Sequence, residues 1–189
     1  MSDIILCCGK VCSGKSTFTR KLEGAFGFYP FSADEWMLKL YEETADRAVF
    51  NDRLSRCVSL IHGLSEKLLD RGNSVALDFG FWTRKDRLAT IERYEARGHR
   101  VILAYFPISL DKQLAFMRKR QESESGLHYR FDEQTVITLN GFFEEPGDDE
   151  RVVSPAEYLA ILERSKQGGV RSRAKKNEPA FARAHCLRP

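Results

Sequence analysis

Apolar and polar residues alternate along the chain in two kinds of block, which predict strands and helices in turn. Short apolar runs bounded by Gly, Pro or Asp, of which Ile4–Cys8 is the clearest, are typical of strands buried in a parallel sheet. Between these runs, apolar residues recur three or four positions apart, as in Leu54, Ile61 and Leu68. That spacing is typical of an amphipathic helix with one buried face.

The pattern locates each expected element. The expected strands are Ile4–Cys8, Phe28–Phe31, Val75–Asp78, Val101–Phe106 and Arg151–Val153. The expected helices are 15–26, Asp34–Glu43, Arg47–Arg71, Thr83–Arg97, 109–120, Phe131–Phe143 and 155–166. Because strands alternate with helices throughout, we predict a three-layer α/β fold, a parallel sheet with helices on both faces. Ligands of such sheets bind beyond the C-terminal ends of the strands, so the candidate chemistry is expected there.

The segment after the first strand, GKVCSGKS at residues 9–16, matches the pattern G-x-x-x-x-G-K-[ST] of a phosphate-binding loop. Its glycines allow backbone N–H groups to turn toward a phosphate, and the following helix adds the positive end of its dipole. We expect Lys15 to reach the outer phosphates and Ser16 to bind Mg²⁺. The predicted ligands are ATP and Mg²⁺. The predicted nucleotide-binding residues are Gly9, Lys10, Val11, Cys12, Ser13, Gly14, Lys15, Ser16 and Thr17.

Two acids stand at the ends of neighbouring strands. Asp34 follows the second strand and Asp78 ends the third. One acid of this kind is expected to support Mg²⁺, and the other to accept a proton from a substrate hydroxyl. The predicted Mg²⁺ ligands are Ser16 and Asp78. The residues alone leave open which acid is the base. They also leave open a structural role, since Asp34 could cap a helix in competition with Ser32.

Basic and aromatic residues surround these strand ends. Arg118 and Arg120 end a helix that precedes a polar loop, and we predict that they stabilise the transferring phosphoryl group from a lid at about 118–131. The alternative is that they favour a helix C-terminus. The predicted substrate-binding residues are Asp34, Trp36, Trp82, Arg84 and Arg87. For the tryptophans, core packing is an equal alternative, and for Arg84 and Arg87 the alternative is a solvated helix surface.

Composition restricts the class of protein. The chain has 189 residues, of which 42% are hydrophobic and 30% charged, so one folded domain is expected. Its five cysteines fit no disulfide or zinc pattern, which favours a reducing compartment. The longest apolar run near the N-terminus is too short for a signal peptide or a membrane span. We therefore predict a cytoplasmic protein without a membrane partner.

The net charge of +3 is distributed unevenly. Residues 167–189 carry six Lys and Arg against one acid, a charge of +5, which leaves −2 for residues 1–166. The sequence therefore predicts a slightly acidic domain at 1–166, which carries the phosphate loop, and a basic C-terminal tail at 167–189. The tail is expected to be solvated and poorly ordered, with contact to an anionic partner as the alternative.

Four segments occur in an order that resembles the small P-loop kinases: GKVCSGKST, FSADEW, VALDFGFWTRKDR and FMRKRQ. They are similar to the group that contains zeta toxin, chloramphenicol phosphotransferase and the kinase domain of polynucleotide kinases, over about residues 3–165. This resemblance implies a five-stranded parallel sheet in the order 2-3-1-4-5. It further implies that Asp34 is the general base, that Asp78 is the acid ending the third strand, and that Arg118 and Arg120 are lid arginines.

The sequence thus predicts a kinase that transfers the γ-phosphoryl group of ATP to a hydroxyl of a small molecule. A kinase for nucleosides, nucleotides or 5′-hydroxyl nucleic-acid ends is the alternative that the basic tail favours. A non-catalytic ATP-binding regulator is the alternative from a different class. The motifs do not predict the acceptor or the oligomeric state.

Overall fold

The computed structural model describes residues 2–44, 46–122 and 129–176. Within them the strands and helices alternate as the hydrophobic pattern predicts. The chain divides into two compact units, Met1–Pro155 and the segment from Ala156 onward. Because residues 123–128 and 177–189 lie outside the described residues, the predicted lid at about 118–131 and the predicted tail are each described only in part.

The described strands form one parallel sheet in the order β2-β3-β1-β4-β5. Their bounds are β1 Asp3–Cys8, β2 Tyr29–Ser32, β3 Val75–Gly80, β4 Arg100–Tyr105 and β5 Val152–Val153. Strand β1 is central, and Ile5 aligns with Ala76 of β3 on one side and Ile102 of β4 on the other. All six residues of β1 are buried, as expected for a strand covered on both faces. The three-layer α/β prediction and the strand order implied by the resemblance are both confirmed.

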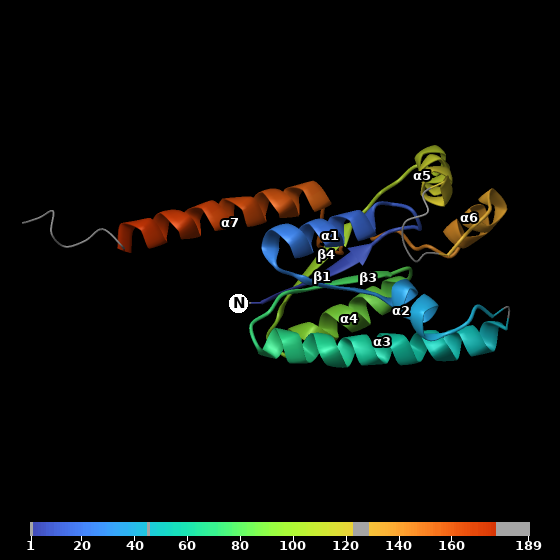
Figure 1. Cartoon of the computed structure of the whole chain (residues 1–189), viewed down its shortest axis with the longest axis horizontal. Coiled ribbons are helices and arrows are strands. Elements are labelled where there is room, and N and C mark those ends of the chain that lie inside the picture. Colours follow the sequence, from blue (N-terminus) through green and yellow to red (C-terminus); the bar gives the residue numbers. More distant parts are fainter. Residues whose placement is uncertain (1, 45, 123–128, 177–189) are drawn as a thin grey trace, which may run out of the picture. The chain divides into compact units, whose positions relative to one another are not determined.

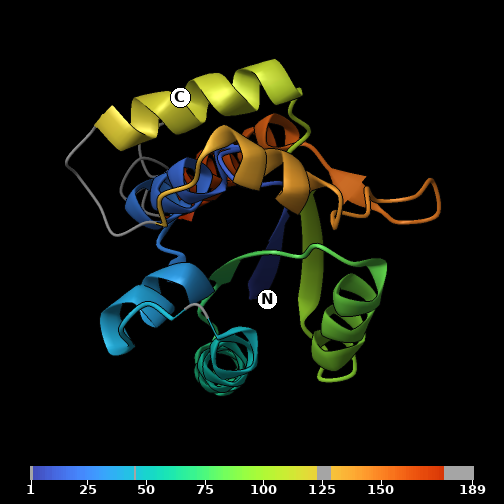
Figure 2. The ribbon, with the colours of Figure 1, turned by 90° about the vertical axis from the view of Figure 1, so that its right-hand side faces the viewer.

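Helices cover both faces of this sheet. Their bounds are α1 Lys15–Phe26, α2 Ala33–Leu40, α3 Arg47–Asp70, α4 Arg84–Glu95, α5 Leu110–Glu122 and α6 Glu133–Asn140. Figure 1 shows α1 on one face and α3 and α4 on the other. Figure 2 views the edge where the strands end, with α5 and α6 above this edge and α2 and α3 below it. In the second unit, helix α7 spans Pro155–Lys176.

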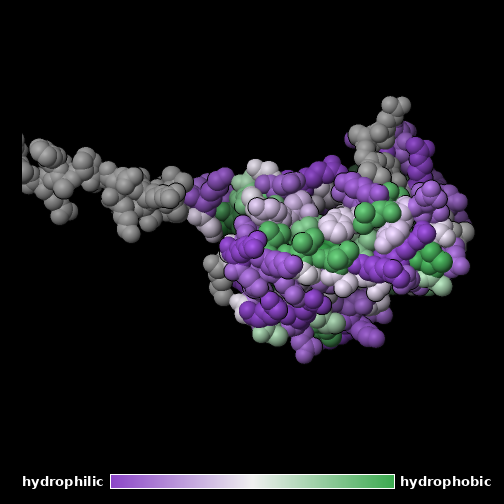
Figure 3. All heavy atoms as spheres, turned by 60° about the horizontal axis from the view of Figure 1, so that its bottom comes forward, coloured by the Kyte–Doolittle hydropathy of each residue, from purple (hydrophilic) through white to green (hydrophobic). Residues whose placement is uncertain are grey.

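The main apolar core lies between the sheet and the layer of α3 and α4. Ile61 and Leu69 of α3 and Tyr94 of α4 pack there against Leu6 and Leu77 of the central strands. The outer side of the same layer is partly apolar. Three leucines on it are well exposed, namely Leu60, Leu64 and Leu88. Figure 3 shows this side of the molecule, with apolar surface near the middle of the face.

Several element ends differ from the predicted ones. Helix α2 ends at Leu40 rather than Glu43. The helix predicted over Phe131–Phe143 spans only Glu133–Asn140, and it begins at Glu133 because Asp132 caps it by accepting the Thr135 amide (2.7 Å). Helix α7 continues beyond residue 166 to Lys176. The hydropathy pattern marks buried faces, whereas a cap marks where a helix begins, and caps are short local signals.

The buried face of α4 also differs from the prediction. By their spacing, the apolar residues Leu88, Ile91 and Tyr94 are expected to share the inner face of this helix, but Leu88 is 44% exposed. The buried residues of α4 are Arg87, Thr90 and Tyr94. Arg87 and Thr90 lie one position before Leu88 and Ile91, so the buried face is rotated from the predicted one. The reason is that an arginine with a buried acidic partner occupies the core position.

Among the described residues, the helices are all too short or too polar to cross a membrane.

Candidate active site at the phosphate loop

The phosphate loop connects the end of β1 to the start of α1. The Gly9 amide donates to the Gly80 carbonyl (3.0 Å), which attaches the start of the loop to the end of β3. A side chain at Gly9 would meet Ser13 Oγ at 2.9 Å and Phe106 O at 3.0 Å, so the close approach of the backbone requires glycine. Gly14 has φ 94°, a left-handed conformation that glycine adopts without strain.

Lys15 folds back over this loop. Its Nζ donates to the carbonyls of Gly9 (2.9 Å) and Lys10 (2.7 Å) and lies 3.5 Å from Ser13 Oγ. The ammonium group therefore lies at the mouth of the loop, where an incoming anion would meet it. This position fits the predicted contact with the outer phosphates of a nucleotide.

Ser16 and Asp78 meet as the metal prediction requires. The Ser16 hydroxyl donates to Asp78 Oδ2 at 2.7 Å, and Asp78 is buried, with 8% of its surface exposed. A hydroxyl and a carboxylate at this separation are hard oxygen donors of the kind that Mg²⁺ binds. Residues 2–44, 46–122 and 129–176 contain no cluster of three or more His, Cys, Asp or Glu that could hold a metal alone. The pair therefore fits an ion that takes its remaining ligands from phosphate and water.

Asp34 lies in the first turn of α2, but it does not cap that helix. Ser32 does so, because its Oγ accepts the Glu35 amide at 3.3 Å. Asp34 is exposed to solvent, but the protein around its carboxyl still desolvates it in part, and this desolvation raises the pKa of Asp34. The charge of Asp78 raises it further, whereas Lys15 and Arg120 act in the opposite direction. The carboxyl of Asp34 thus lies within electrostatic range of all three groups.

The two predicted lid arginines have different surroundings. Arg118 forms an exposed ion pair with Glu133 of α6, its Nε lying 3.0 Å from Oε1. Arg120 instead acts electrostatically on Asp34. The buried residues of α5 are Gln113 and Met117, whereas the side chain of Arg118 is 60% exposed.

The predicted substrate residues divide into two groups. Trp36 packs edge-on against Phe31, with ring centroids 6.1 Å apart, and lies on the same helix as Asp34. Trp82 packs edge-on against Phe143 at 5.9 Å, and Arg84 pairs with Asp149 through two hydrogen bonds of 2.8 and 2.5 Å. These contacts place Trp82 and Arg84 beside the segment that follows α6.

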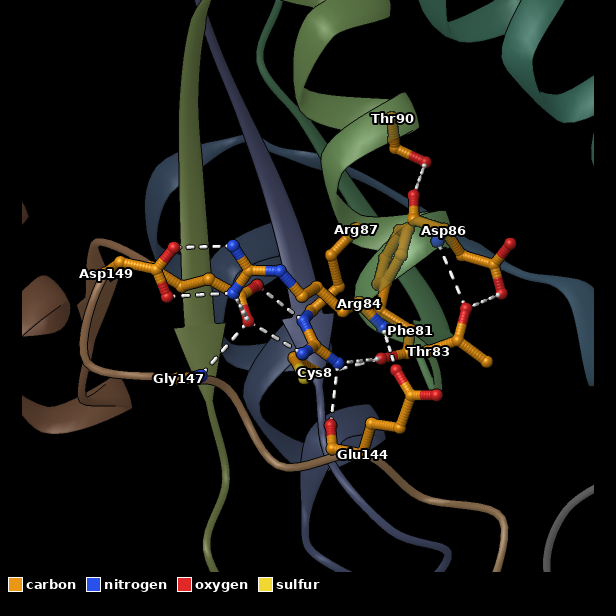
Figure 4. Close-up of polar contacts among 11 residues, drawn as sticks. Cys8, Phe81, Thr83, Arg84, Asp86, Arg87, Thr90, Glu144, Gly147 and Asp149 are labelled. Atoms are coloured by element: carbon orange, nitrogen blue, oxygen red, sulfur yellow. Dashed lines mark hydrogen bonds and ion pairs between the residues drawn. The ribbon is translucent and has the colours of Figure 1, made fainter.

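Arg87 is placed where no substrate can reach it. Its side chain is fully buried, and its Nε and Nη2 donate to the two carboxylate oxygens of Glu150 at 2.7 and 2.8 Å. In place of the predicted substrate contact, Arg87 forms an internal ion pair with Glu150. Figure 4 shows Arg87 and its surroundings.

Some contacts of the site region involve residues that are not among the predicted site residues, namely Tyr129, Glu145 and Phe143. Tyr129 lies near Asp34, whose charge contributes to raising the pKa of the Tyr129 hydroxyl after burial, and its ring is 6.2 Å from that of Phe50. Lys10 pairs with Glu145 (3.4 Å) and lies over the ring of Phe143. These contacts join residues far apart in the chain, and no local motif marks them.

Comparison with known proteins places this geometry in a family. Residues 4–146 match the family model AAA_33, described as an AAA domain. A "putative kinase" from Chloroflexus aurantiacus J-10-fl is 14% identical, with a TM-score of 0.65, over 89% of this chain and 97% of its own. A gluconokinase from Sinorhizobium meliloti 1021 is 18% identical, with a TM-score of 0.54, over 90% and 97%.

A third similar structure is a chain of the Pnkp1/Rnl/Hen1 RNA repair complex, 14% identical with a TM-score of 0.57, over 75% of this chain and 43% of that one. No curated protein shows significant similarity to the chain. At these identities the structural likenesses show a common fold.

Proposed function

Because this chain belongs to the AAA_33 family of AAA domains and has a kinase-like P-loop fold, we propose that it is an ATP-dependent phosphotransferase. It transfers the γ-phosphoryl group of ATP to a hydroxyl of a small molecule. The observation that carries this proposal is the convergence of Lys15, the Ser16–Asp78 pair and Asp34 at the ends of β1, β2 and β3.

The phosphate loop binds the nucleotide. Lys15 exchanges its bonds to the loop carbonyls for bonds to the β- and γ-phosphates, while the loop amides and the start of α1 bind the remaining oxygens. Ser16 and Asp78 hold Mg²⁺, which supplies positive charge against the phosphates when it is bound.

Asp34 acts as the general base. A carboxylate whose pKa is raised by desolvation holds a proton better, which suits proton transfer from a hydroxyl. The acceptor proton passes to Asp34, the acceptor oxygen bonds to the γ-phosphorus, and the bond from that phosphorus to the β–γ bridging oxygen breaks, so ADP leaves. Arg120 stabilises the negative charge in transfer, and Arg118 can join it only after leaving Glu133.

The test is phosphoryl transfer from labelled ATP to pools of hydroxylated metabolites, followed by the Asp34→Asn variant with the acceptor found. We expect kcat to fall at least 100-fold, the scale of a lost general base, with ATP affinity retained. Glu35→Gln is the matched control, because Glu35 is the neighbouring acid in the same helical turn, and it should keep activity. Full activity of Asp34→Asn would show that Asp34 is not the base.

A second candidate is a kinase for 5′-hydroxyl ends of nucleic acids or for nucleosides and nucleotides. Two observations favour it, the shared fold with a chain of the RNA repair complex and the basic residues 167–189. Labelled ATP offered together with metabolites and 5′-hydroxyl oligonucleotides separates the two acceptor classes. Tight ATP binding without transfer to either class would instead support a non-catalytic ATP-binding regulator.

A further inference from the structure

Arg87 is a fully buried arginine whose guanidinium contacts three different segments. Besides its paired bonds to Glu150, its Nη1 donates to the carbonyls of Phe81 (3.2 Å) and Glu144 (2.7 Å). Glu150 is equally enclosed, with 2% of its side chain exposed, and it also accepts the Gly147 amide at 3.1 Å. Figure 4 shows Arg87 with dashed lines to the labelled residues Phe81 and Glu144.

The Phe81 carbonyl belongs to an unusual turn. Gly80 and Phe81 have φ values of 78° and 47°, so two successive residues are left-handed, and for phenylalanine this conformation carries strain. A side chain at Gly80 would meet Trp82 Nε1 at 2.4 Å, which leaves the turn no room for another residue. The turn begins two residues after Asp78. A strained conformation persists only where neighbouring groups hold it, and Arg87 donates directly to it.

The same turn is also bonded to the end of β1 and to the start of the phosphate loop. Gly80 accepts the Gly9 amide at 3.0 Å, and Phe81 accepts the Cys8 thiol at 3.5 Å. The turn is therefore bonded both to Arg87 and to the first residue of the phosphate loop. A shift of the turn would move Asp78 and Gly9 relative to each other.

The stability of the Arg87–Glu150 ion pair does not by itself explain why charged residues occupy these two positions. Buried ion pairs are seldom more stabilising than apolar residues of similar size, because both charges must be desolvated. An apolar residue at position 87, however, would leave the Phe81 and Glu144 carbonyls without their donor. The planar guanidinium can satisfy a carboxylate and two carbonyls in fixed directions, which a lysine cannot.

We propose that the Arg87–Glu150 pair is a positioning device that holds the turn at Gly80–Phe81 and thereby sets Asp78 against the phosphate loop for binding of Mg²⁺ with ATP. This inference rests on the proposed function for its metal and nucleotide. It assigns to Arg87 a role through Asp78, without contact to the substrate.

The test compares two variants with a matched control. Arg87→Lys keeps a charge but loses the fork, and the double variant Arg87→Met/Glu150→Met removes both charges, so that neither is left buried alone. The control is Arg93→Met/Glu66→Met, which removes an exposed arginine–glutamate pair (2.8 Å) that joins the same helix α4 to α3.

The first readout is the dissociation constant of ATP, measured by calorimetry with Mg²⁺ and with EDTA. We expect the gain in affinity from Mg²⁺ to fall about 10-fold in the Arg87 variants, the scale on which loss of a group that orients a metal ligand weakens metal binding, and to stay unchanged in the control. The second readout needs no metal. Hydrogen exchange of the Gly9 amide should become faster in the Arg87 variants, because its acceptor Gly80 lies in the turn.

An Arg87 variant that stays folded and keeps both the wild-type gain from Mg²⁺ and the wild-type Gly9 exchange would overturn the proposal. If the wild-type protein binds no ATP, the proposed function fails instead. The Gly9 exchange then still decides whether Arg87 holds the turn.

Discussion

His62 and Tyr94 form a buried polar contact among the aromatic residues beneath the sheet. His62 Nδ1 lies 2.7 Å from the Tyr94 hydroxyl, and the His62 ring packs edge-on against Phe79. Burial lowers the pKa of His62 to about 4, with a smaller contribution from Arg93, and Glu66 opposes the shift. Burial also raises the pKa of Tyr94 to about 12. Both side chains are therefore neutral at pH 7.

This contact predicts that the protein loses stability on acidification at pH values above those at which ordinary carboxylates become protonated. The pKa of His62 is lower in the folded state than in the unfolded chain, so the unfolded state binds more protons between pH 6.5 and 4, and stability falls as the pH falls through that window. We expect the free energy of unfolding to drop by about 1 kcal/mol from this group between pH 7.5 and 5.5.

Urea denaturation of the wild type and of His62→Gln at both pH values measures this contribution. The variant should show a correspondingly smaller drop, since glutamine does not titrate. Equal drops in the two proteins would show that His62 is not the group responsible.

Single residues divide into those with a local signal and those without one. The positions of Asp34 and Asp78 at strand ends followed from the strand pattern, and β2 and β3 place them there. The burial of Arg87 could not be predicted, because its partner Glu150 is 63 residues away and arginine is usually a surface residue. The site roles of Lys15 and Asp34 stay predictions until activity is measured.

At the scale of elements, helices α5 and α6 are joined to the phosphate loop by a pair of side-chain amides. Gln113 of α5 is fully buried, and its Nε2 donates to the Val11 carbonyl (3.0 Å) and to Asn140 Oδ1 (3.1 Å). Asn140 of α6 returns a bond from Nδ2 to Gln113 Oε1 at 2.7 Å. The helices that carry the basic residues are thereby tied to the loop that they are proposed to act on.

This amide pair predicts a defect in both stability and nucleotide binding. Gln113→Leu keeps a similar volume but leaves the Val11 carbonyl unpaired, which should cost about 1–3 kcal/mol of unfolding free energy. We also expect ATP to bind several-fold more weakly, since Val11 lies within the phosphate loop.

Thermal melts and ATP titration measure the two effects. Gln134→Leu on the exposed face of α6 is the control and should change neither quantity. A Gln113→Leu protein with wild-type ATP affinity would show that the amide pair does not shape the loop.

The elements themselves were largely predictable, and their ends less so. Each expected strand and helix of the described chain is present, because apolar spacing reports burial directly. The inner face of α4 was misplaced because it is built from Arg87 and Thr90 as well as from apolar residues. The aromatic contact of Tyr129 with Phe50 depends on tertiary packing between distant segments, which no single segment encodes.

At the scale of the whole molecule, the net charge differs between residues 1–166 and residues 167–189. The excess of positive charge belongs to residues 167–189, whereas the phosphate loop and its partners belong to the first compact unit. Helix α7 includes the first part of these residues, up to Lys176. The predicted separation of a 1–166 domain from a 167–189 tail remains a prediction.

This separation predicts the outcome of a truncation. Removing residues 167–189 should leave the ATP dissociation constant within about twofold of the wild type, since none of these residues belongs to the loop. Any binding of a 5′-hydroxyl oligonucleotide should fall, together with its dependence on salt concentration, because lysine and arginine contacts to phosphates release counterions. Fluorescence anisotropy at several salt concentrations measures both. Oligonucleotide binding that survives the truncation would place the nucleic-acid contact in residues 1–166.

The bonds of Lys15 to the Gly9 and Lys10 carbonyls bear on how any lysine variant is interpreted. In the free protein the Lys15 ammonium group is already hydrogen-bonded to two carbonyls of the loop. Nucleotide binding would therefore exchange these hydrogen bonds for bonds to phosphate. Replacing Lys15 would therefore remove the phosphate contact and also an internal crosslink of the empty loop. The measured loss of affinity would then combine the missing charge with the disorder that ATP must overcome, and comparing the free proteins by hydrogen exchange would separate the two.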